Sequence, residues 1–416
     1  MIAMDPICIN NYCFDRIHLW IQYDWQIPQF IEVVIEVFYP KNRKANGLVM
    51  FNHGFLVGND LFFYPKKVIG AFTGDNPLFA INPSAYYNYS AAIVEQNWAM
   101  AFVSAAHSQT VGIPGIDIGG NPRVGQEAYA AASYLIKYGA TDFFYREEET
   151  SRNRSFFDST VATSAKFMVS NKVIFAGHSV GGAHAQAAAC GFEKLQELGK
   201  KNYRVFDPVM FDREFIPAYS ERLSKWDPAD RADPVGLLQL SPVDQKIPIL
   251  SPGMKLYREA LSTAAMPMLM IVGECDCACL DDSNPPACSD DPKKVTQYTQ
   301  LAPAKSDSWS VLAKVAKGSH CGYLTLKNDL CSMADKPSEC KRCPGVESYK
   351  PEGDETALTT ELLKRLIAHC SLHGGHAENR DSWLRSECIT WLNKESPDGV
   401  VKLVPFSDGQ FVAYAR

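Results

Sequence analysis

The sequence lacks any excess of positive charge and any long apolar run. Its 41 lysines and arginines are outnumbered by 47 aspartates and glutamates, so the formal net charge is −6. That balance gives no electrostatic basis for binding nucleic acid. No apolar run reaches the roughly 18 residues that a membrane-spanning helix needs, and we expect no transmembrane segment. Met1 to Pro6 have neither the basic nor the apolar region of a signal peptide, although a mature form that has lost one has the same appearance.

The residues that are present suffice for a large globular core. The 416 residues are 46% hydrophobic and 21% charged, which is typical of globular proteins. We predict a single α/β domain over residues 1–416, acting as a monomer. Within it, residues 191–233 break the alternation of strands and helices and are interpreted as an insertion or cap. Residues 326–416 are interpreted as a helical, cysteine-rich extension.

Cysteine is abundant and unevenly placed. Of 13 cysteines, most lie in the last third of the chain: Cys275, Cys277, Cys279, Cys288, Cys321, Cys331, Cys340, Cys343, Cys370 and Cys388. Such clustering in loops favours disulfides, and hence an extracellular or secretory compartment. A zinc site at Cys331, Cys340 and Cys343 is the alternative, but a second ligand pair at suitable spacing is missing. The odd number leaves at least one thiol unpaired or paired with another molecule.

The pattern of apolar segments predicts an α/β fold with a mostly parallel central sheet flanked by helices. An antiparallel hairpin is expected at 17–21 and 31–38, and an apolar tail after 400. Further strands are expected at 48–51, 98–103, 172–176, 235–240, 267–272 and 314–316, and helices at 91–96, 126–138, 355–371 and 379–393.

The segment from Lys172 to Ala189 carries the strongest chemical signal. A short apolar run ends in Gly177-His178-Ser179-Val180-Gly181 and continues into an alanine-rich, helix-favouring stretch. This is the strand–turn–helix context of a nucleophile elbow, in which a tight turn lifts a serine above the sheet. The two glycines are needed because the backbone segments approach too closely for a Cβ atom. We therefore predict Ser179 to be a nucleophile.

A serine nucleophile needs a histidine base and a carboxylate that orients the base. In this fold the chain order is serine, acid, histidine, each after a successive strand. Asp276 follows the apolar strand at 267–272, and His320 lies in the loop after the next strand. Glu274 is the competing acid. Asp276 is preferred because a residue slightly beyond the strand end can bend back to the histidine.

The oxyanion hole and the substrate contacts are predicted from loops at the same edge of the sheet. The backbone N–H groups of Phe55 and Val180 are the expected oxyanion donors. Gly54 allows its loop to approach the substrate closely. His178, Gly54 and His107 are the candidates for substrate contact, while His53 is expected to brace its loop.

Four motifs together resemble the α/β-hydrolase superfamily. They are His53-Gly54-Phe55, Gly177-His178-Ser179-Val180-Gly181-Gly182, Ser241-Pro242-Val243-Asp244 and Gly318-Ser319-His320-Cys321-Gly322. More narrowly, they resemble the branch of chlorophyllases, platelet-activating-factor acetylhydrolases and cutinase-like polyester hydrolases. The resemblance covers roughly residues 30–190 and 235–325. It implies a carboxylic ester substrate, a serine acyl-enzyme intermediate and no metal or other cofactor.

The leading hypothesis is therefore a serine esterase acting on an apolar small-molecule or polymeric ester. An amidase, a peptidase or an acyltransferase on the same frame is the second, because the residues of the site are common to all of them. A non-catalytic binding protein that kept the fold is the third, and the presence of all three residue types in order argues against it.

Overall fold

The fold comes from a computed structural model. It describes residues 7–22, 30–42, 44–54, 83–105, 126–139, 141–145, 160–162, 167–195, 226–242, 266–276, 309–315, 317–326, 354–373, 401–406 and 410–415, with the single residues 223, 331, 335, 343 and 345.

The strands are β1 (Ile7–Ile9), β2 (Tyr12–Gln22), β3 (Phe30–Pro40), β4 (Lys44–Ala45), β5 (Leu48–Asn52), β6 (Ala99–Ala105), β7 (Thr141–Tyr145), β8 (Thr160–Ala162), β9 (Met168–Val169), β10 (Lys172–His178), β11 (Asp233–Leu240), β12 (Pro267–Gly273), β13 (Trp309–Val315), β14 (Val401–Phe406) and β15 (Gln410–Ala415). The α-helices are α2 (Asn88–Glu95), α3 (Gln126–Tyr138), α5 (Val180–Ala188) and α11 (Asp354–His373), with short 3-10 helices η2 (Pro83–Tyr86) and η4 (Pro228–Asp230).

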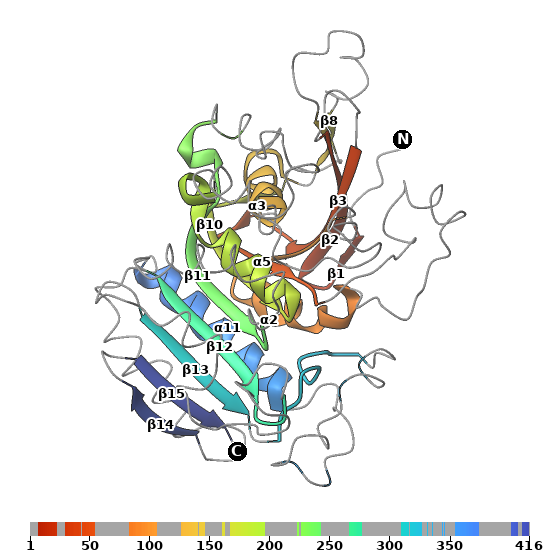
Figure 1. The fold of residues 1–416 in the computed structure, drawn as a ribbon. Coiled ribbons are helices and arrows are strands. Elements are labelled where there is room, and N and C mark those ends of the chain that lie inside the picture. Colours follow the sequence, from red (N-terminus) through yellow and green to blue (C-terminus); the bar gives the residue numbers. More distant parts are fainter. Residues whose placement is uncertain are drawn as a thin grey trace, which may run out of the picture.

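One 13-stranded sheet runs through the molecule in the order β14-β15-β13-β12-β11-β10-β5-β6-β3-β2-β7-β8, and β1 pairs with β2 (Figure 1). The run from β6 through β5, β10, β11, β12 and β13 to β15 is parallel. Antiparallel pairing lies toward the ends, at β3–β6, β2–β3, β7–β8 and β14–β15. The predicted α/β class with a mostly parallel sheet is therefore confirmed.

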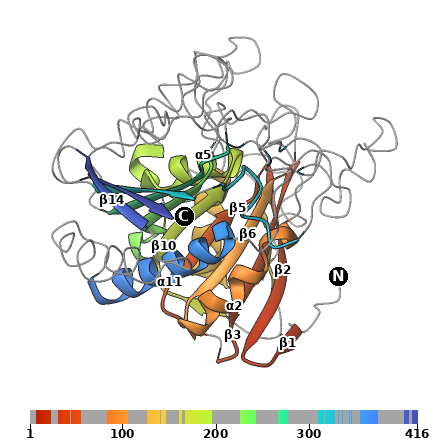
Figure 2. The ribbon, with the colours of Figure 1, turned by 90° about the horizontal axis from the view of Figure 1, so that it is seen from below.

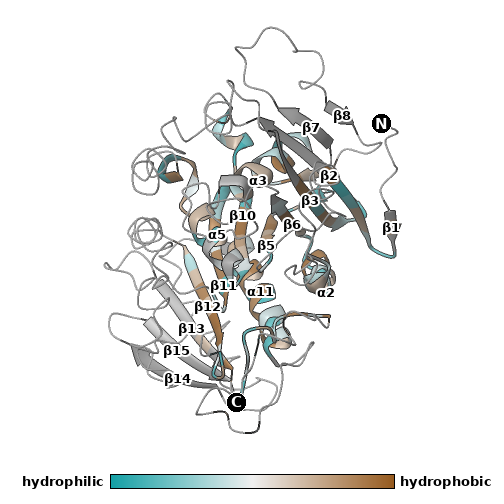
Figure 3. Cartoon of the chain, turned by 45° about the vertical axis from the view of Figure 1, so that its right-hand side comes forward, coloured by the Kyte–Doolittle hydropathy of each residue, from teal (hydrophilic) through white to brown (hydrophobic). Residues whose placement is uncertain are grey.

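Helices cover both faces of this sheet because the central strands are apolar on both sides. In β5, Leu48 and Met50 pack into the core beneath α3 and α5, while Val49 and Phe51 pack into the core beneath α2 and α11. Figure 2 shows α5 on one side of the strands and α2 and α11 on the other. The central strands are brown in Figure 3, where brown marks hydrophobic residues. The layers hold the strand ends in fixed positions relative to one another.

The prediction and the structure differ most at the C-terminal end. The predicted β2–β3 hairpin is confirmed, with Ile17 opposite Ile35. The strand predicted at 314–316 is longer than expected, because β13 begins at Trp309. The apolar tail forms the hairpin β14–β15, and β15 joins the sheet beside β13. The predicted helix at 379–393 and most of the insertion at 191–233 lie outside the described residues, so the domain assignment stays a prediction.

Within the described ranges, the helices are either too short or too polar to cross a membrane.

We predict that Gly181→Ala disrupts the fold at α5. A Cβ atom there would lie 2.1 Å from the backbone oxygen of Asn52, far inside van der Waals contact. We expect the free energy of unfolding to fall by more than about 2 kcal/mol, as measured by urea denaturation. The matched control is Gly236→Ala in β11, where the nearest atoms would lie at 3.4 Å. Equal stability of the two variants would contradict the close contact at Gly181.

Candidate active site

Ser179 stands in a tight turn between β10 and α5. Its backbone has φ 56° and ψ −122°, a conformation that is strained for a residue with a side chain. The turn is closed by backbone contacts, because a Cβ on Gly177 would lie 2.1 Å from the Gly181 oxygen. The strand, the turn and the helix therefore have the geometry predicted for a nucleophile elbow.

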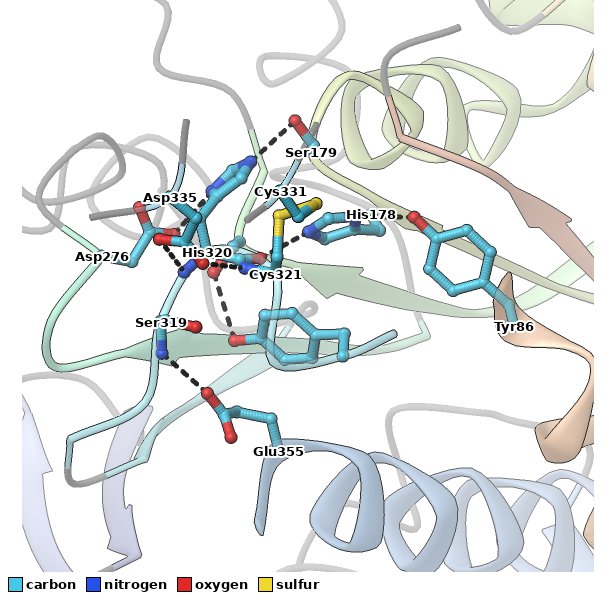
Figure 4. Close-up of polar contacts among 12 residues, drawn as sticks. Tyr86, His178, Ser179, Asp276, Ser319, His320, Cys321, Cys331, Asp335 and Glu355 are labelled. Atoms are coloured by element: carbon cyan, nitrogen blue, oxygen red, sulfur yellow. Dashed lines mark hydrogen bonds and ion pairs between the residues drawn. A yellow bond between two sulfur atoms is a disulfide. The ribbon is translucent and has the colours of Figure 1, made fainter. Parts of the chain in front are cut away.

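The imidazole of His320 lies between Ser179 and Asp276 (Figure 4). Its Nε2 is 2.9 Å from the Ser179 Oγ, and its Nδ1 is 2.8 Å from the Asp276 Oδ2. The three residues follow β10, β12 and β13, whose carboxyl ends lie at one edge of the sheet. The structure thus brings the three predicted side chains together within hydrogen-bond distance.

A second close backbone contact brings Asp276 and His320 together. A Cβ on Gly273 would lie 2.4 Å from the Gly318 carbonyl group, and the N–H of Cys275 donates to the Gly318 oxygen over 2.8 Å. The turn at the end of β12 therefore lies directly against the His320 segment. The competing acid Glu274 is directed elsewhere, and its carboxylate accepts the N–H of Lys317 at 3.2 Å.

The electrostatics favour a charged imidazole next to a carboxylate. Burial by itself lowers the pKa of His320, but the charge and hydrogen bond of Asp276, together with the charge of Asp335, raise it to about 9. The Asp276 side chain is 1% exposed and the His320 side chain 24% exposed. In its neutral form this imidazole can accept the proton of the Ser179 hydroxyl as the oxygen attacks an electrophile.

His178 is buried behind the site instead of facing it. Its ring is 0% exposed. Its Nδ1 lies 2.7 Å from the Tyr86 hydroxyl, and its Nε2 lies 2.7 Å from the backbone oxygen of His320. Burial, with a smaller effect from the His320 ring, lowers its pKa to about 3, so the imidazole is neutral. The predicted contact with substrate is therefore corrected: both ring nitrogens are engaged inside the protein, and His178 supports His320.

Tyr86 connects this histidine to the loop after β5. Its hydroxyl accepts the N–H of Gly54 at 3.2 Å and lies within hydrogen-bond distance of His178. A neutral His178 fits a single direction, in which Tyr86 donates to Nδ1 and Nε2–H donates to His320. The Gly54 loop and the His320 backbone are thus joined by one chain of hydrogen bonds. His53 is half-buried beside its own loop, with Nδ1 2.6 Å from the Gly54 oxygen, as expected for a bracing residue.

The predicted oxyanion donors are described only in part. The N–H of Val180 belongs to the first turn of α5, where N–H groups have no intrahelical partner and the helix dipole is positive. Phe55 and His107 lie outside the described residues, and their roles stay predictions. Gly54 is described and buried, at the end of the segment that leads to Phe55.

Disulfides lie next to both Asp276 and His320. Cys275, which precedes Asp276, pairs with Cys343, and Cys321, which follows His320, pairs with Cys331. Near the N-terminus, Cys8 pairs with Cys13. The preference for disulfides over zinc is confirmed for Cys331 and Cys343, and the described residues contain no group of three or more His, Cys, Asp or Glu side chains arranged to hold a metal.

Three further residues beside the site were missed by sequence reasoning: Tyr86, Asp335 and Glu355. Tyr86 lies in an aromatic-rich stretch that gave no reason to single it out. Asp335 follows the Cys321–Cys331 loop, and Glu355 lies in the first turn of α11, far along the chain. All three act on backbone groups, and no residue-type pattern marks such contacts.

Comparison with solved structures finds distant similarity to two enzymes. The dienelactone hydrolase of Anabaena variabilis ATCC 29413 has 12% sequence identity, with 85% of this chain and 98% of that chain covered and a TM-score of 0.33. A variant of the esterase rPPE has 13% identity, with 86% and 83% covered and a TM-score of 0.36. No protein-family model and no curated protein sequence matches the chain.

The described elements form an α/β fold with a mostly parallel sheet, in which Ser179, Asp276 and His320 follow β10, β12 and β13. The superfamily that the motifs resemble, and the narrower branch within it, stay predictions.

We predict that Tyr86→Phe lowers both stability and the reactivity of Ser179. The variant leaves the buried Gly54 N–H and the His178 Nδ1 without the shared hydroxyl. We expect a loss of about 1–3 kcal/mol in unfolding free energy, and slower modification of Ser179 by a fluorophosphonate.

The control for this variant is Tyr129→Phe on α3, whose buried hydroxyl donates to the Ala232 oxygen over 2.7 Å. It should lose comparable stability and keep normal labelling. Equal labelling rates for both variants would remove Tyr86 from the support of the site.

Proposed function

We propose that this protein is a serine hydrolase that cleaves carboxylic esters. Ser179 is the nucleophile, His320 the general base and acid, and Asp276 the residue that orients and stabilises the imidazolium. The observation that carries the proposal is the position of the His320 ring, with Nε2 2.9 Å from Ser179 Oγ and Nδ1 2.8 Å from Asp276 Oδ2. The strained turn that holds Ser179 supports the same role.

The proposed reaction has two steps. Ser179 Oγ attacks the ester carbonyl carbon while His320 Nε2 takes its proton, and the carbonyl oxygen becomes a tetrahedral oxyanion. The N–H of Val180, with that of Phe55 as the predicted second donor, stabilises this charge. The intermediate collapses to an acyl-enzyme as His320 gives its proton to the departing alcohol. Water, deprotonated by His320, then releases the acid and restores Ser179.

The first test is Ser179→Ala. We expect it to abolish hydrolysis of p-nitrophenyl esters and labelling by a fluorophosphonate, with an unchanged circular dichroism spectrum. Ser170→Ala, in the turn before β10, removes a hydroxyl that bonds only to a backbone oxygen, and it should keep full activity. Turnover that survives in Ser179→Ala would refute the nucleophile assignment.

The substrates used in this test also separate the esterase from its alternatives. A panel of esters of increasing acyl length, including chlorophyll and an aromatic polyester, is compared with amides of the same acyl groups. Faster turnover of the apolar esters supports the proposal. Faster turnover of the amides, or acyl transfer to an added alcohol in preference to water, would assign an amidase or an acyltransferase instead.

The pH dependence gives the second test. His320 accepts a proton only when it is neutral, and Asp276 raises the pKa of the imidazole toward about 9. Activity should therefore rise with pH through the alkaline range and be lost as the pH falls below this pKa. Asp276→Asn should lower kcat by about 10,000-fold and move the inflection of kcat/KM to lower pH.

Glu274→Gln is the matched control for the acid. Its carboxylate bonds to a backbone N–H away from the ring, so kcat and the inflection should stay close to those of the wild type. If Glu274→Gln lost activity and Asp276→Asn kept it, the acid would be Glu274.

A further inference from the structure

The backbone that carries His320 is held by side chains from distant parts of the chain. The N–H of Ser319 donates to Glu355 Oε1 over 2.7 Å. The next two N–H groups share one carboxylate: that of His320 lies 3.3 Å from Asp335 Oδ1, and that of Cys321 lies 2.8 Å from Asp335 Oδ2. The His320 oxygen accepts from His178. The position of the imidazole therefore depends on these contacts as well as on Asp276.

Asp335 is costly to bury and is nevertheless buried. Asp335 is only 8% exposed to solvent. Burial, with a smaller effect from the charge of Asp276, raises the pKa of its carboxyl group above the usual value, while His320, the Cys321 N–H and the Ser319 side chain act in the opposite direction. Both oxygens accept backbone hydrogen bonds, which favours the ionised form. A charge is retained in such a place only where fixed partners compensate its lost hydration.

A disulfide helps to hold Asp335 in this position. Cys331 is bonded to Cys321, which directly follows His320, and the N–H of Asp335 donates to the Cys331 oxygen over 2.9 Å. The carboxylate, the disulfide and the His320 backbone therefore form one closed unit (Figure 4). Small displacements of Asp335 are passed to the residue that must align with Ser179.

The carboxylate also acts on the ring by its charge. The charge of Asp335 raises the pKa of His320, as that of Asp276 does, although Asp276 is the one of these two carboxylates that is hydrogen-bonded to the imidazole. The charged or titratable groups that face the His320 segment in the described residues are Asp276, Glu274, Lys317, Asp335, Glu355 and His178. Tyr86 stays neutral because burial raises its pKa.

We propose that Asp335 is a positioning residue for His320: its carboxylate fixes the backbone that carries the imidazole and adds a second negative charge near the ring. This proposal rests on the proposed function of the site at Ser179, His320 and Asp276. Asp335 does not contact the reacting atoms. Its effect reaches them through the alignment and the proton affinity of His320.

The test is Asp335→Asn, which keeps the size of the side chain and removes its charge. With a p-nitrophenyl ester we expect kcat to fall about 10- to 100-fold, KM to change little, and the inflection of kcat/KM to move down by about 0.5 to 1 pH unit. Fluorophosphonate titration counts the folded sites, so that kcat refers to active protein only. Asp230→Asn, which removes a half-exposed ion pair with Lys137, is the matched control and should change neither quantity.

A lower melting temperature with unchanged kcat and an unchanged inflection would overturn the proposal, because Asp335 would then be structural only. If Asp335→Asn gives no soluble protein, the proposal is tested with Asp335→Glu. This variant keeps the negative charge but moves the carboxylate by the length of one carbon–carbon bond. It should retain the inflection and lower kcat, and a wild-type kcat would overturn the proposal. Failure of the proposed function is recognised separately, because the wild type would then not be labelled at Ser179.

Discussion

Backbone packed directly on backbone at Gly181 is the constraint on which the rest of the site depends. The first turn of α5 lies so close to the end of β5 that no side-chain atom fits between them. This contact fixes the turn that carries Ser179 and the loop at Gly54 relative to each other. A second contact of the same kind, between Gly273 and Gly318, fixes Asp276 relative to His320. These two backbone contacts thus set the position of Ser179 relative to the Gly54 loop, and that of Asp276 relative to His320, without the help of polar side chains.

The polar side chains then make that geometry specific. The His320 segment is held through successive backbone groups by Glu355, Asp335 and His178, each of them buried. Buried polar groups of this kind are stable only when every member is satisfied, and they lose much of their value if one partner is removed. Burying several ionisable groups in one place costs free energy of hydration. Here these groups hold the imidazole of His320 in one orientation.

The sequence predicts the parts of the fold and the site that depend on residue type and spacing. Gly177, Gly181 and the helix-favouring stretch after Ser179 identify the elbow, and the apolar runs before Asp276 and His320 place both at strand ends. Contacts that join a side chain to a distant backbone group leave no such pattern, which is why Asp335 and Glu355 were missed. His178 was misjudged for a related reason, since a residue beside a nucleophile can point into the core as readily as toward solvent. The sequence predicts only an apolar tail where the β14–β15 hairpin lies, because nothing in the residue pattern indicates that β15 pairs with β13.

The pairing of β15 with β13 has a consequence for how the chain is completed. β13 leads into the His320 segment, and its far edge is covered by residues 410–415, the last that form a strand. Without them its backbone N–H and C=O groups would lie unpaired at a sheet margin, a position that invites pairing with other chains. A variant that lacks residues 410–415 would therefore expose the edge of β13, the strand that leads to His320, to association with other chains.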